Sequence, residues 1–365
     1  MKIAAIEVIE AVVPFDDGGS GIGITPGRWD SLEFVLVRVE TDTGLIGWGE
    51  CFAYSCRAAV ATAARTMVAP LLEGRELPAT PEPLNLELQK RLHIFGRYGI
   101  AMFAISGFDI ALWDIAAQAQ GKPLHALLGP QVRNEVSAYA SLVRYGDPAL
   151  VKKYCSDAKA LGYRFVKLHE IEPAVMRAAR EACGPEIGIS VDVNCAWSPD
   201  VARERIPVLQ EIDAMWIEEP VFPPEDIFNQ AAINREFPVG AGENACTRYE
   251  FARMIDAGAV RFAQPSVIKV GGITEFVGVC AYAAAKGVAV MPHTPYFGPG
   301  YFATLHLLAG LRGEPLFEHL YIRPAADIAL GGTPLPVQGT VPIPSSPGVG
   351  FAPDPAVLAR FRLNA

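Results

Sequence analysis

The sequence predicts an α/β fold in which a TIM-type barrel carries an α+β unit at its N-terminal end. From about residue 134 onward, short apolar segments alternate with amphipathic helical segments. Such strand–helix repeats give parallel strands joined by right-handed crossovers. Eight apolar segments are present, which is typical of a barrel, although open sheets can also contain eight strands.

Composition limits the classes of protein to which the chain can belong. It has 365 residues, of which 51% are hydrophobic and 19% charged, so it can bury a large core. A net charge of −9 argues against a nucleic-acid-binding surface. Glu7 and Glu10 interrupt the apolar start, and no run approaches the roughly 18 apolar residues that span a bilayer. The seven scattered cysteines suit reduced thiols in a cytoplasmic protein.

The N-terminal unit is predicted to be an antiparallel sheet with helices packed on it. Apolar patterns predict strands at 2–13, 32–40 and 45–50, and helices at 57–72, 82–95 and 100–120. A glycine-rich stretch, 14–30, follows the first strand. Its G-x-G pieces do not make a nucleotide loop, because Pro26 and another strand follow where a helix should begin. We therefore expect a mobile surface flap there.

The barrel strands are expected in eight segments: 135–141, 164–169, 187–193, 214–219, 238–243, 260–266, 288–293 and 316–320. The tail from Gly331 is rich in proline and glycine and ends in a short helical piece, PAVLARFRL. We expect this tail to pack back on the N-terminal unit. The predicted divisions of the chain are 1–125, 126–330 and 331–365.

A polar or ionisable residue ends each predicted barrel strand from the second onward. Successive strand ends lie 23 to 27 residues apart, which is the length of one strand–helix unit. These side chains should therefore meet at the carboxyl ends of the strands, where barrel enzymes place their chemistry. They are Lys167 and His169, Asp192 and Asn194, Glu218 and Glu219, Glu243 and Asn244, Ser266, His293, and Glu318.

Three successive strands end in carboxylates, which are Asp192, Glu218 and Glu243. On adjacent strands, three uncompensated carboxylates would repel one another strongly. A hard divalent cation removes that repulsion, and ligation by oxygen alone suits Mg²⁺. The sequence therefore predicts a magnesium site. The alternative is three separate, salt-bridged surface acids.

Basic groups flank the predicted metal site. Lys167 and His169 alternate along one strand and so share a face, while His293 lies on a later strand. A metal between proton acceptors suits removal of the proton next to a carboxylate, with an enediolate as the resulting anion. The sequence thus indicates a small-molecule carboxylate as the substrate.

The chain resembles the enolase superfamily, in particular its mandelate racemase-like branch. The likeness is carried by FAISGFDIALWDIAAQAQGKPLHALLG and by the strand ends VDVN, WIEEP, AGEN and KVGGITE. The resemblance implies a modified TIM barrel, (β/α)7β, under an α+β capping domain. It also implies Mg²⁺ bound by the three acids and two cap loops, near 15–30 and 51–57, that cover the substrate. Tyr54 and Arg57 are the expected contacts from the second loop.

The resemblance assigns roles to four further residues. Lys167 matches a lysine that contacts the substrate carboxylate, and Asn194 matches a polar residue beside the metal. Glu318 matches an acid that hydrogen-bonds the enediolate, and His293 matches the histidine of a His–Asp dyad.

Two positions depart from the family pattern. His169 replaces the second lysine of a K-x-K motif, which leaves a shorter base with a lower reference pKa. Ser266 replaces the aspartate of the dyad, so we expect His293 to lose its anionic partner and to become a weaker base. A serine hydroxyl can still hold the ring but adds no charge.

Three activities are compatible with these residues. The first is a Mg²⁺-dependent dehydratase of a polyhydroxy acid, with His169 or His293 as the base and a histidine, preferably His293, as the general acid. The second is a racemase, epimerase or cycloisomerase. The third is a metal-binding barrel without catalysis. We expect no nucleic-acid or membrane partner, and a homo-oligomer of between two and eight subunits.

Overall fold

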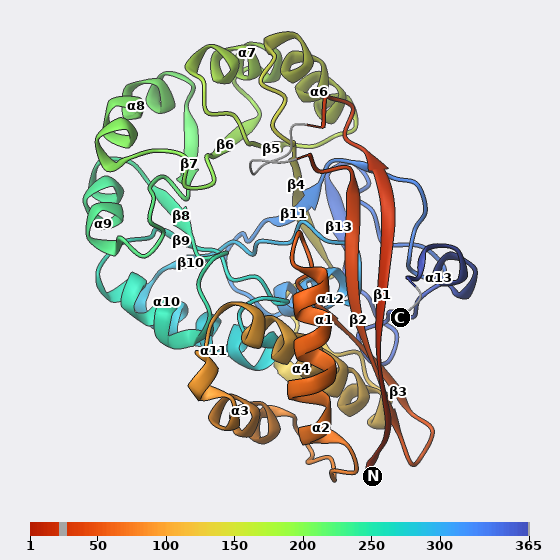
Figure 1. Ribbon diagram of the computed structural model, residues 1–365. Helices are drawn as coiled ribbons and strands as arrows, with labels where there is room; N and C mark the ends of the chain where they lie inside the picture. The colour runs from red at the N-terminus through yellow and green to blue at the C-terminus, as the bar shows by residue number, and fades with distance from the viewer. Residues whose placement is uncertain (22–27, 364–365) are drawn as a thin grey trace.

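The chain forms a curled parallel sheet of barrel type beside a separate antiparallel sheet with its own helices (Figure 1). The computed structural model describes residues 1–21 and 28–363. The predicted fold class is confirmed. The expected flap at 14–30 includes residues 22–27, which lie outside the described residues.

The capping sheet has the strand order β12-β1-β2-β3 and antiparallel pairing throughout. Its strands are β1 (Ile3–Asp16), β2 (Ser31–Thr41), β3 (Ile46–Cys51) and the short β12 (Arg323–Pro324). The three strands predicted here are all present. β1 continues to Asp16, into the stretch expected to be the flap, because Phe15 and Asp16 pair with β12.

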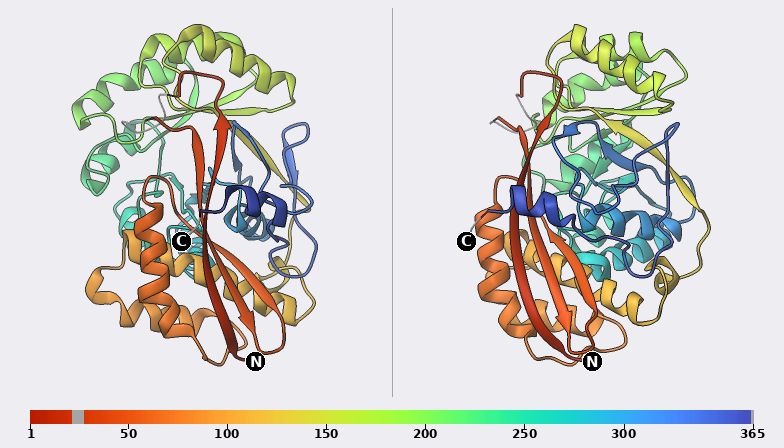
Figure 2. Two further views of the ribbon diagram at one scale, coloured as in Figure 1. Left: turned by 45° about the vertical axis from the view of Figure 1, so that its right-hand side comes forward. Right: turned by 90° about the vertical axis from the view of Figure 1, so that its right-hand side faces the viewer.

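Helices cover this sheet on one side, as Figure 2 shows. They are α1 (Arg57–Ala63), a π-helical turn (Ala64–Val68), α2 (Ala69–Leu72), α3 (Glu82–Arg91), a 3-10 turn (His93–Phe95) and α4 (Gly99–Ala119). Helix α4 lies directly against β3. A Cβ atom on Gly49 would lie 1.8 Å from the carbonyl oxygen of Gly107, so this contact requires glycine in the strand.

No run was expected to approach the roughly 18 apolar residues that span a bilayer, yet α4, although Asp109 and Asp114 interrupt it, is long and apolar enough to cross one. It has 21 residues, and its 18-residue apolar window has a mean hydropathy of 1.6, which is enough for a membrane-spanning helix. The physical reason is burial, because 89% of the apolar window is enclosed by the rest of the protein. Asp109 of α4 accepts hydrogen bonds from the backbone N and the hydroxyl of Thr274, at 2.9 and 2.7 Å. Helix α4 is thus a core helix that joins the cap to the barrel.

The barrel consists of eight parallel strands and the seven helices between them, which is a (β/α)7β arrangement. The short helix α5 (His125–Leu128) leads into it. The strands are β4 (Glu135–Ser141), β5 (Phe165–Leu168), β6 (Gly188–Asp192), β7 (Ala214–Glu218), β8 (Val239–Ala241), β9 (Phe262–Ala263), β10 (Ala289–Val290) and β11 (Phe317–Leu320). The helices are α6 (Pro148–Ala160), α7 (Pro173–Cys183), α8 (Pro199–Glu211), α9 (Ile227–Glu236), α10 (Thr247–Asp256), α11 (Gly272–Lys286) and α12 (Pro299–Ala309). The ladder runs from β10 through β4 to β11.

All eight predicted barrel strands are present, but those near residues 260 and 288 are much shorter than expected. β9 and β10 each span only two residues. Pro265 and Pro292 follow them, and proline has no backbone N–H to donate to a neighbouring strand. Ser266 and His293 therefore lie on irregular backbone beyond the strand ends.

The C-terminal tail lies against both parts of the molecule. β13 (Thr340–Pro342) pairs with β4 of the barrel. Helix α13 (Pro355–Phe361) ends beside the cap, where Arg362 forms a bridge with Ala11 of β1. The tail was expected to pack back on the cap, and it pairs with the barrel as well. Its pairing with the barrel depends on register, which its proline-rich composition does not specify.

Candidate active site

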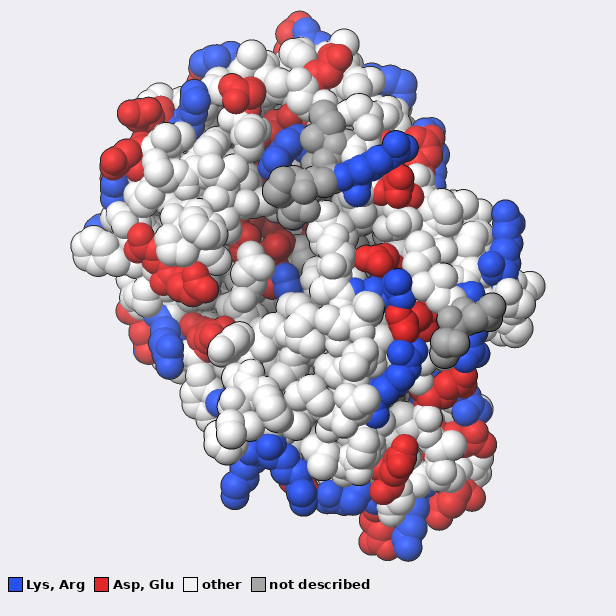
Figure 3. Space-filling model, viewed as in Figure 1, with Lys and Arg blue, Asp and Glu red and all other residues white. Residues whose placement is uncertain are grey.

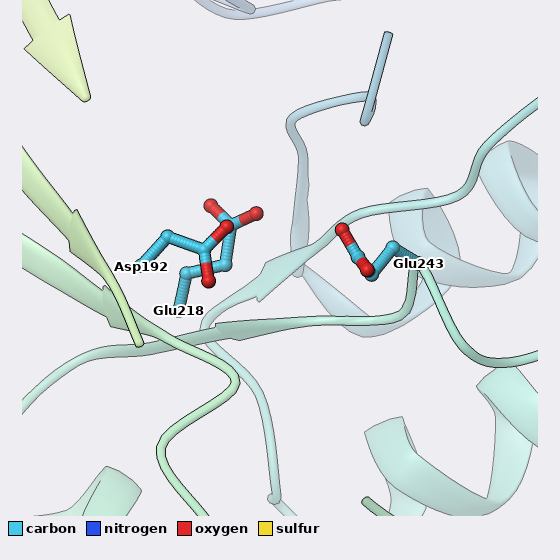
Figure 4. Close-up of side chains that lie close together, drawn as sticks. All are labelled: Asp192, Glu218 and Glu243. Carbon is cyan, nitrogen blue, oxygen red and sulfur yellow. The ribbon is translucent and has the colours of Figure 1, made fainter. Parts of the chain in front are cut away.

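Three carboxylates meet at the carboxyl ends of adjacent barrel strands. Asp192 ends β6 and Glu218 ends β7, and the two residues are register partners. Glu243 lies two residues beyond β8 and follows Gly242, which has a positive φ of 138°. One oxygen of each carboxylate lies within 4.8 Å of the others, and the three surround a common space in Figure 4. This geometry brings together the three residues predicted to bind a metal.

The ammonium group of Lys167 lies beneath these acids and is shared among carboxylates. Its Nζ lies 3.2 Å from Asp192, 2.9 Å from Glu218 and 2.7 Å from Glu318. Burial opposes the charged form, but Glu218 and Glu318 hold the pKa of Lys167 well above its ordinary value. The side chain is fully buried. The structure therefore shows Lys167 as a buried counterion of these acids, and the contact with the substrate that the resemblance implies stays a prediction.

The negative charge at the barrel mouth exceeds what Lys167 can neutralise. Burial raises the pKa of Glu218 to about 8, although Lys167 opposes this shift and Asp192 adds to it. Burial, with Glu243 and Asp192, also holds the pKa of Glu219 well above its ordinary value. A bound cation reduces the repulsion between crowded carboxylates and favours their ionised forms. An all-oxygen set of three carboxylates fits a hard divalent cation such as Mg²⁺.

Neighbouring polar groups fix the orientation of Glu218. Gln264 donates from Nε2 to its Oε2 at 2.6 Å, and Trp216 donates from Nε1 to the same atom at 3.4 Å. Both side chains are almost completely buried. Hydrogen bonds of this kind orient a carboxylate before it binds a metal.

His169 occupies one flank of the acid cluster in a defined tautomer. Its Nδ1 lies 2.5 Å from the carbonyl oxygen of Leu142, which can only accept, so Nδ1 carries a proton. Its Nε2 lies 3.2 Å from Asp192. The nitrogen available to exchange a proton with a substrate is therefore Nε2, which faces Asp192 of the acid cluster.

His293 occupies the other flank, but its partners differ from the prediction. Its Nε2 lies 2.7 Å from Glu243, so an anion does contact the ring, although the replacement of the dyad aspartate by Ser266 was expected to leave the ring without one. Ser266 could have held the ring but does not do so in the structure. The Ser266 hydroxyl lies 3.4 Å from Tyr296 Oη, and Nδ1 of His293 is buried without a hydrogen-bond partner among the described residues. A serine side chain is shorter than the aspartate of the family's His–Asp dyad, and its hydroxyl does not replace that carboxylate.

Asn194 and Glu318 lie within the same cluster. Asn194 has a positive φ of 46°, and its backbone N donates to Asp192 at 2.8 Å. Glu318 accepts from Ser141 Oγ and from Thr294 N, each at 2.8 Å. Burial opposes ionisation of Glu318, but Lys167 and His293 hold its pKa below the ordinary value. Ionised Glu318 is a counterion for Lys167. To donate a hydrogen bond to an enediolate, as the resemblance implies, Glu318 would have to be protonated.

Sequence analysis missed two basic groups at this site. Lys269 is buried, with Nζ 3.4 Å from Asn244 Oδ1 and 4.0 Å from Glu243, over the ring of Phe52. Arg144, after β4, donates from Nε to the carbonyl of His169 at 2.6 Å. Lys269 stands in the quoted KVGG motif, three residues after Ser266. Arg144 gave no signal, because it does not stand at the end of its strand.

The cap contributes one of its two predicted contact residues to the cap–barrel boundary. Tyr54 packs edge-on against Trp29 at 4.9 Å, beside a cavity of about 40 Å³ that barrel residues Tyr296 and Phe297 also line. Arg57 does not take part. It forms ion pairs with Glu10 of β1 and Glu33 of β2. These partners belong to the capping sheet, so the structure gives Arg57 the role of holding its own loop.

The surface view shows the site as a hollow. Figure 3 looks at the same face as Figure 1 and shows acidic side chains inside a depression near the centre of the barrel. The position agrees with that of the three carboxylates at the strand ends, which could hold a metal ion.

Fold and site together define a barrel enzyme of the enolase type. Residues 150–357 match the family described as enolase C-terminal domain-like. Residues 22–129 match the N-terminal domain of mandelate racemase / muconate lactonizing enzyme. The chain belongs to the mandelate racemase/muconate lactonizing enzyme family of the enolase superfamily.

Relatives with similar chains carry out two kinds of reaction. The chain is 29% identical to D-galactarolactone cycloisomerase of Agrobacterium fabrum, covering 92% of this chain and 93% of that one. It is 32% identical to D-galactonate dehydratase of Ralstonia pickettii, covering 91% of both. The crystal structure of a racemase from Streptomyces coelicolor A3(2) with bound magnesium matches with a TM-score of 0.88 at 27% identity, covering 99% of this chain and 100% of that one.

These likenesses make the protein an enzyme, of lyase or isomerase type. Its curated relatives act as dehydratases and cycloisomerases. The activities of these relatives weigh against the alternative of a metal-binding barrel without catalysis.

The cap–barrel boundary contains a buried acid that makes stability depend on pH. Glu50 of β3 accepts from Gly300 N at 2.9 Å, and burial raises its pKa to about 8. The pKa of Glu50 is higher in the folded than in the unfolded protein. The stabilisation that protonated Glu50 contributes is therefore complete below about pH 4.5 and is lost as pH rises through 8. Relative to Glu50→Gln, the free energy of unfolding should fall by up to ~1.4 kcal/mol per pH unit across that window. Denaturant unfolding at several pH values tests this, and parallel pH curves for the two proteins would contradict it.

Proposed function

We propose that the protein dehydrates a polyhydroxy (sugar) acid to a 2-keto-3-deoxy acid in a Mg²⁺-dependent reaction. The observation that carries this proposal is the placement of two histidines. His169 contacts Asp192, His293 contacts Glu243, and these two acids lie on opposite sides of the cluster in Figure 4. A substrate at the cluster would therefore have a proton-transfer group on each side.

The chain's acids provide the setting for the reaction. Asp192, Glu218 and Glu243 would hold Mg²⁺, which when bound supplies positive charge beside the substrate carboxylate. Lys167 keeps part of the acid cluster neutral and in place through its ion pairs. Because the acids are buried, their electrostatic effect on a developing negative charge is larger than it would be in water.

We assign His169 as the base. Its Nδ1–H is fixed on the carbonyl of Leu142, so Nε2 is the nitrogen that would accept the proton from the carbon alpha to the carboxylate. Nε2 faces Asp192, and its lone pair would become available when that carboxylate holds Mg²⁺. The electron pair of that C–H bond passes into the substrate carboxylate as an enediolate. The fixed tautomer avoids any rearrangement of the ring before proton transfer.

We assign His293 as the general acid. Its Nε2 is the nitrogen that contacts Glu243, and it is therefore the one that carries a proton. Donation of that proton to the β-hydroxyl breaks the C–O bond and releases water. The enol that remains becomes the 2-keto-3-deoxy acid as C3 gains a proton and the C2 hydroxyl loses one. His169 then gives up the proton it took and His293 regains one, so the overall change is the loss of one water molecule.

Racemisation, epimerisation or cycloisomerisation is the second candidate, on the same geometry. Bases on both sides of an enediolate can remove a proton from one face and return it to the other. The likeness to a cycloisomerase adds support to this alternative.

Incubation with a panel of sugar acids and Mg²⁺ in D₂O tests the proposed function. A dehydratase forms a 2-keto product, which is detected as its hydrazone and by NMR. Deuterium incorporation with inversion or ring formation and no keto product would support the second candidate and exclude the first. Absence of both exchange and product across the panel would contradict the whole proposal.

Single substitutions should separate the two histidines. We expect His169→Gln to lower alpha-proton exchange by at least ~10²-fold, because general base catalysis contributes that much. We expect His293→Gln to retain exchange but to lose formation of the keto product. NMR exchange rates and keto-acid assays provide the measurements, and His93→Gln, at an exposed position, is the control. The reverse pattern would exchange the two assignments.

A further inference from the structure

A guanidinium group without an acidic partner lies at the edge of the active site. Arg144 follows β4 and is half-buried. Its Nη2 donates to Asn194 Oδ1 at 3.4 Å, and its Nε donates to the carbonyl of His169 at 2.6 Å. Within the described residues, 1–21 and 28–363, no carboxylate lies within 4.0 Å of it, and its Nη1 makes no hydrogen bond.

The loop that carries Arg144 is held firmly in place. Buried Glu170 accepts from Tyr145 N at 2.7 Å and from Gly146 N at 3.1 Å. These bonds fix the backbone directly after Arg144, and the bond to His169 fixes its side chain. Arg144 is therefore presented beside the proposed base in a preorganised position, as a binding group requires.

The incomplete pairing of Arg144 is costly unless a ligand completes it. Burial lowers the pKa of Arg144, which means that the charged form is partly desolvated, while Asp192 and Glu170 oppose this shift. A guanidinium binds a carboxylate through two parallel N–H···O bonds, and its Nη1 is still available for such a pair. Asn194 lies between Arg144 and the acid cluster, since it accepts from Arg144 and donates to Asp192. Arg144 can therefore contact a part of the substrate other than the carboxylate next to the reacting carbon.

We propose that Arg144 binds a second carboxylate, at the far end of the substrate, so that the preferred substrate is a sugar diacid rather than a sugar monoacid. This inference rests on the proposed function, because it assumes that the first carboxylate binds at the acid cluster. It adds the chemical class of the substrate, which the acid cluster and the two histidines leave open.

Matched pairs of substrates test the inference. Each six-carbon diacid is compared with the monoacid of the same configuration, which carries CH₂OH in place of the second carboxylate. The wild-type enzyme should have a higher kcat/KM for the diacid of the best pair. In Arg144→Gln, the ratio of diacid to monoacid kcat/KM should fall at least tenfold, mainly through the KM for the diacid. Arg144→Lys retains the charge but not the pair of parallel N–H donors of a guanidinium. The ratio should therefore fall less in Arg144→Lys than in Arg144→Gln.

The alternative is that Arg144 only supports the backbone of His169. In that case Arg144→Gln would lower activity on both substrates equally, through kcat, and an unchanged ratio would overturn the inference. Arg133→Gln is the matched control, because Arg133 also donates to backbone carbonyls, at 2.7 and 2.8 Å, but precedes β4 at the other end of the barrel. It should leave the ratio unchanged.

The outcomes also separate this inference from the proposed function. Turnover of monoacids with no preference for any diacid would overturn the role of Arg144 and leave the proposed function standing. Absence of alpha-proton exchange with every monoacid and diacid in the panel would overturn both.

Discussion

The arrangement of the active site depends on one electrostatic constraint, which is the excess of buried negative charge at the barrel mouth. A single ammonium group, that of Lys167, is shared by Asp192, Glu218 and Glu318 within 3.2 Å. Burial nevertheless raises the pKa of Glu218 to about 8, because one positive charge cannot compensate several desolvated carboxylates. The positions of His169, His293, Lys269 and Arg144 around the mouth follow the same constraint, since each lies next to one of these acids or its neighbours.

The fold produces this concentration of charge through repetition. Each strand–helix unit returns the chain to the same end of the barrel, so acids about 25 residues apart become neighbours. The cap then covers the mouth from one side. Its core helix α4 is joined to α11 through Asp109, and Glu50 of β3 reaches the start of α12. Capping and barrel elements are thus fixed to each other by buried polar contacts close to the site.

The sequence was sufficient to predict the barrel, the cap and the meeting of Asp192, Glu218 and Glu243, because strand periodicity determines which residues share one end of a sheet. It was not sufficient to predict individual side-chain partners. Glu243 contacts His293, which was expected to lack an anionic partner, and Arg57 pairs with Glu10 and Glu33 inside the cap. These contacts depend on side-chain length and on the packing of residues far apart in sequence. The burial of α4 was also invisible to composition, since core helices and membrane spans have similar hydropathy.

The central claim is that the acid cluster is organised to bind a divalent cation, and calorimetric titration with Mg²⁺ tests it most directly. The account predicts one Mg²⁺ per chain in the wild-type protein and at least a tenfold loss of affinity in Glu243→Ala, because that substitution removes one of three ligands. Glu236→Ala, an exposed acid at the end of α9, is the control and should bind as the wild type does. No Mg²⁺ binding by the wild type, or unchanged affinity in Glu243→Ala, would contradict the account.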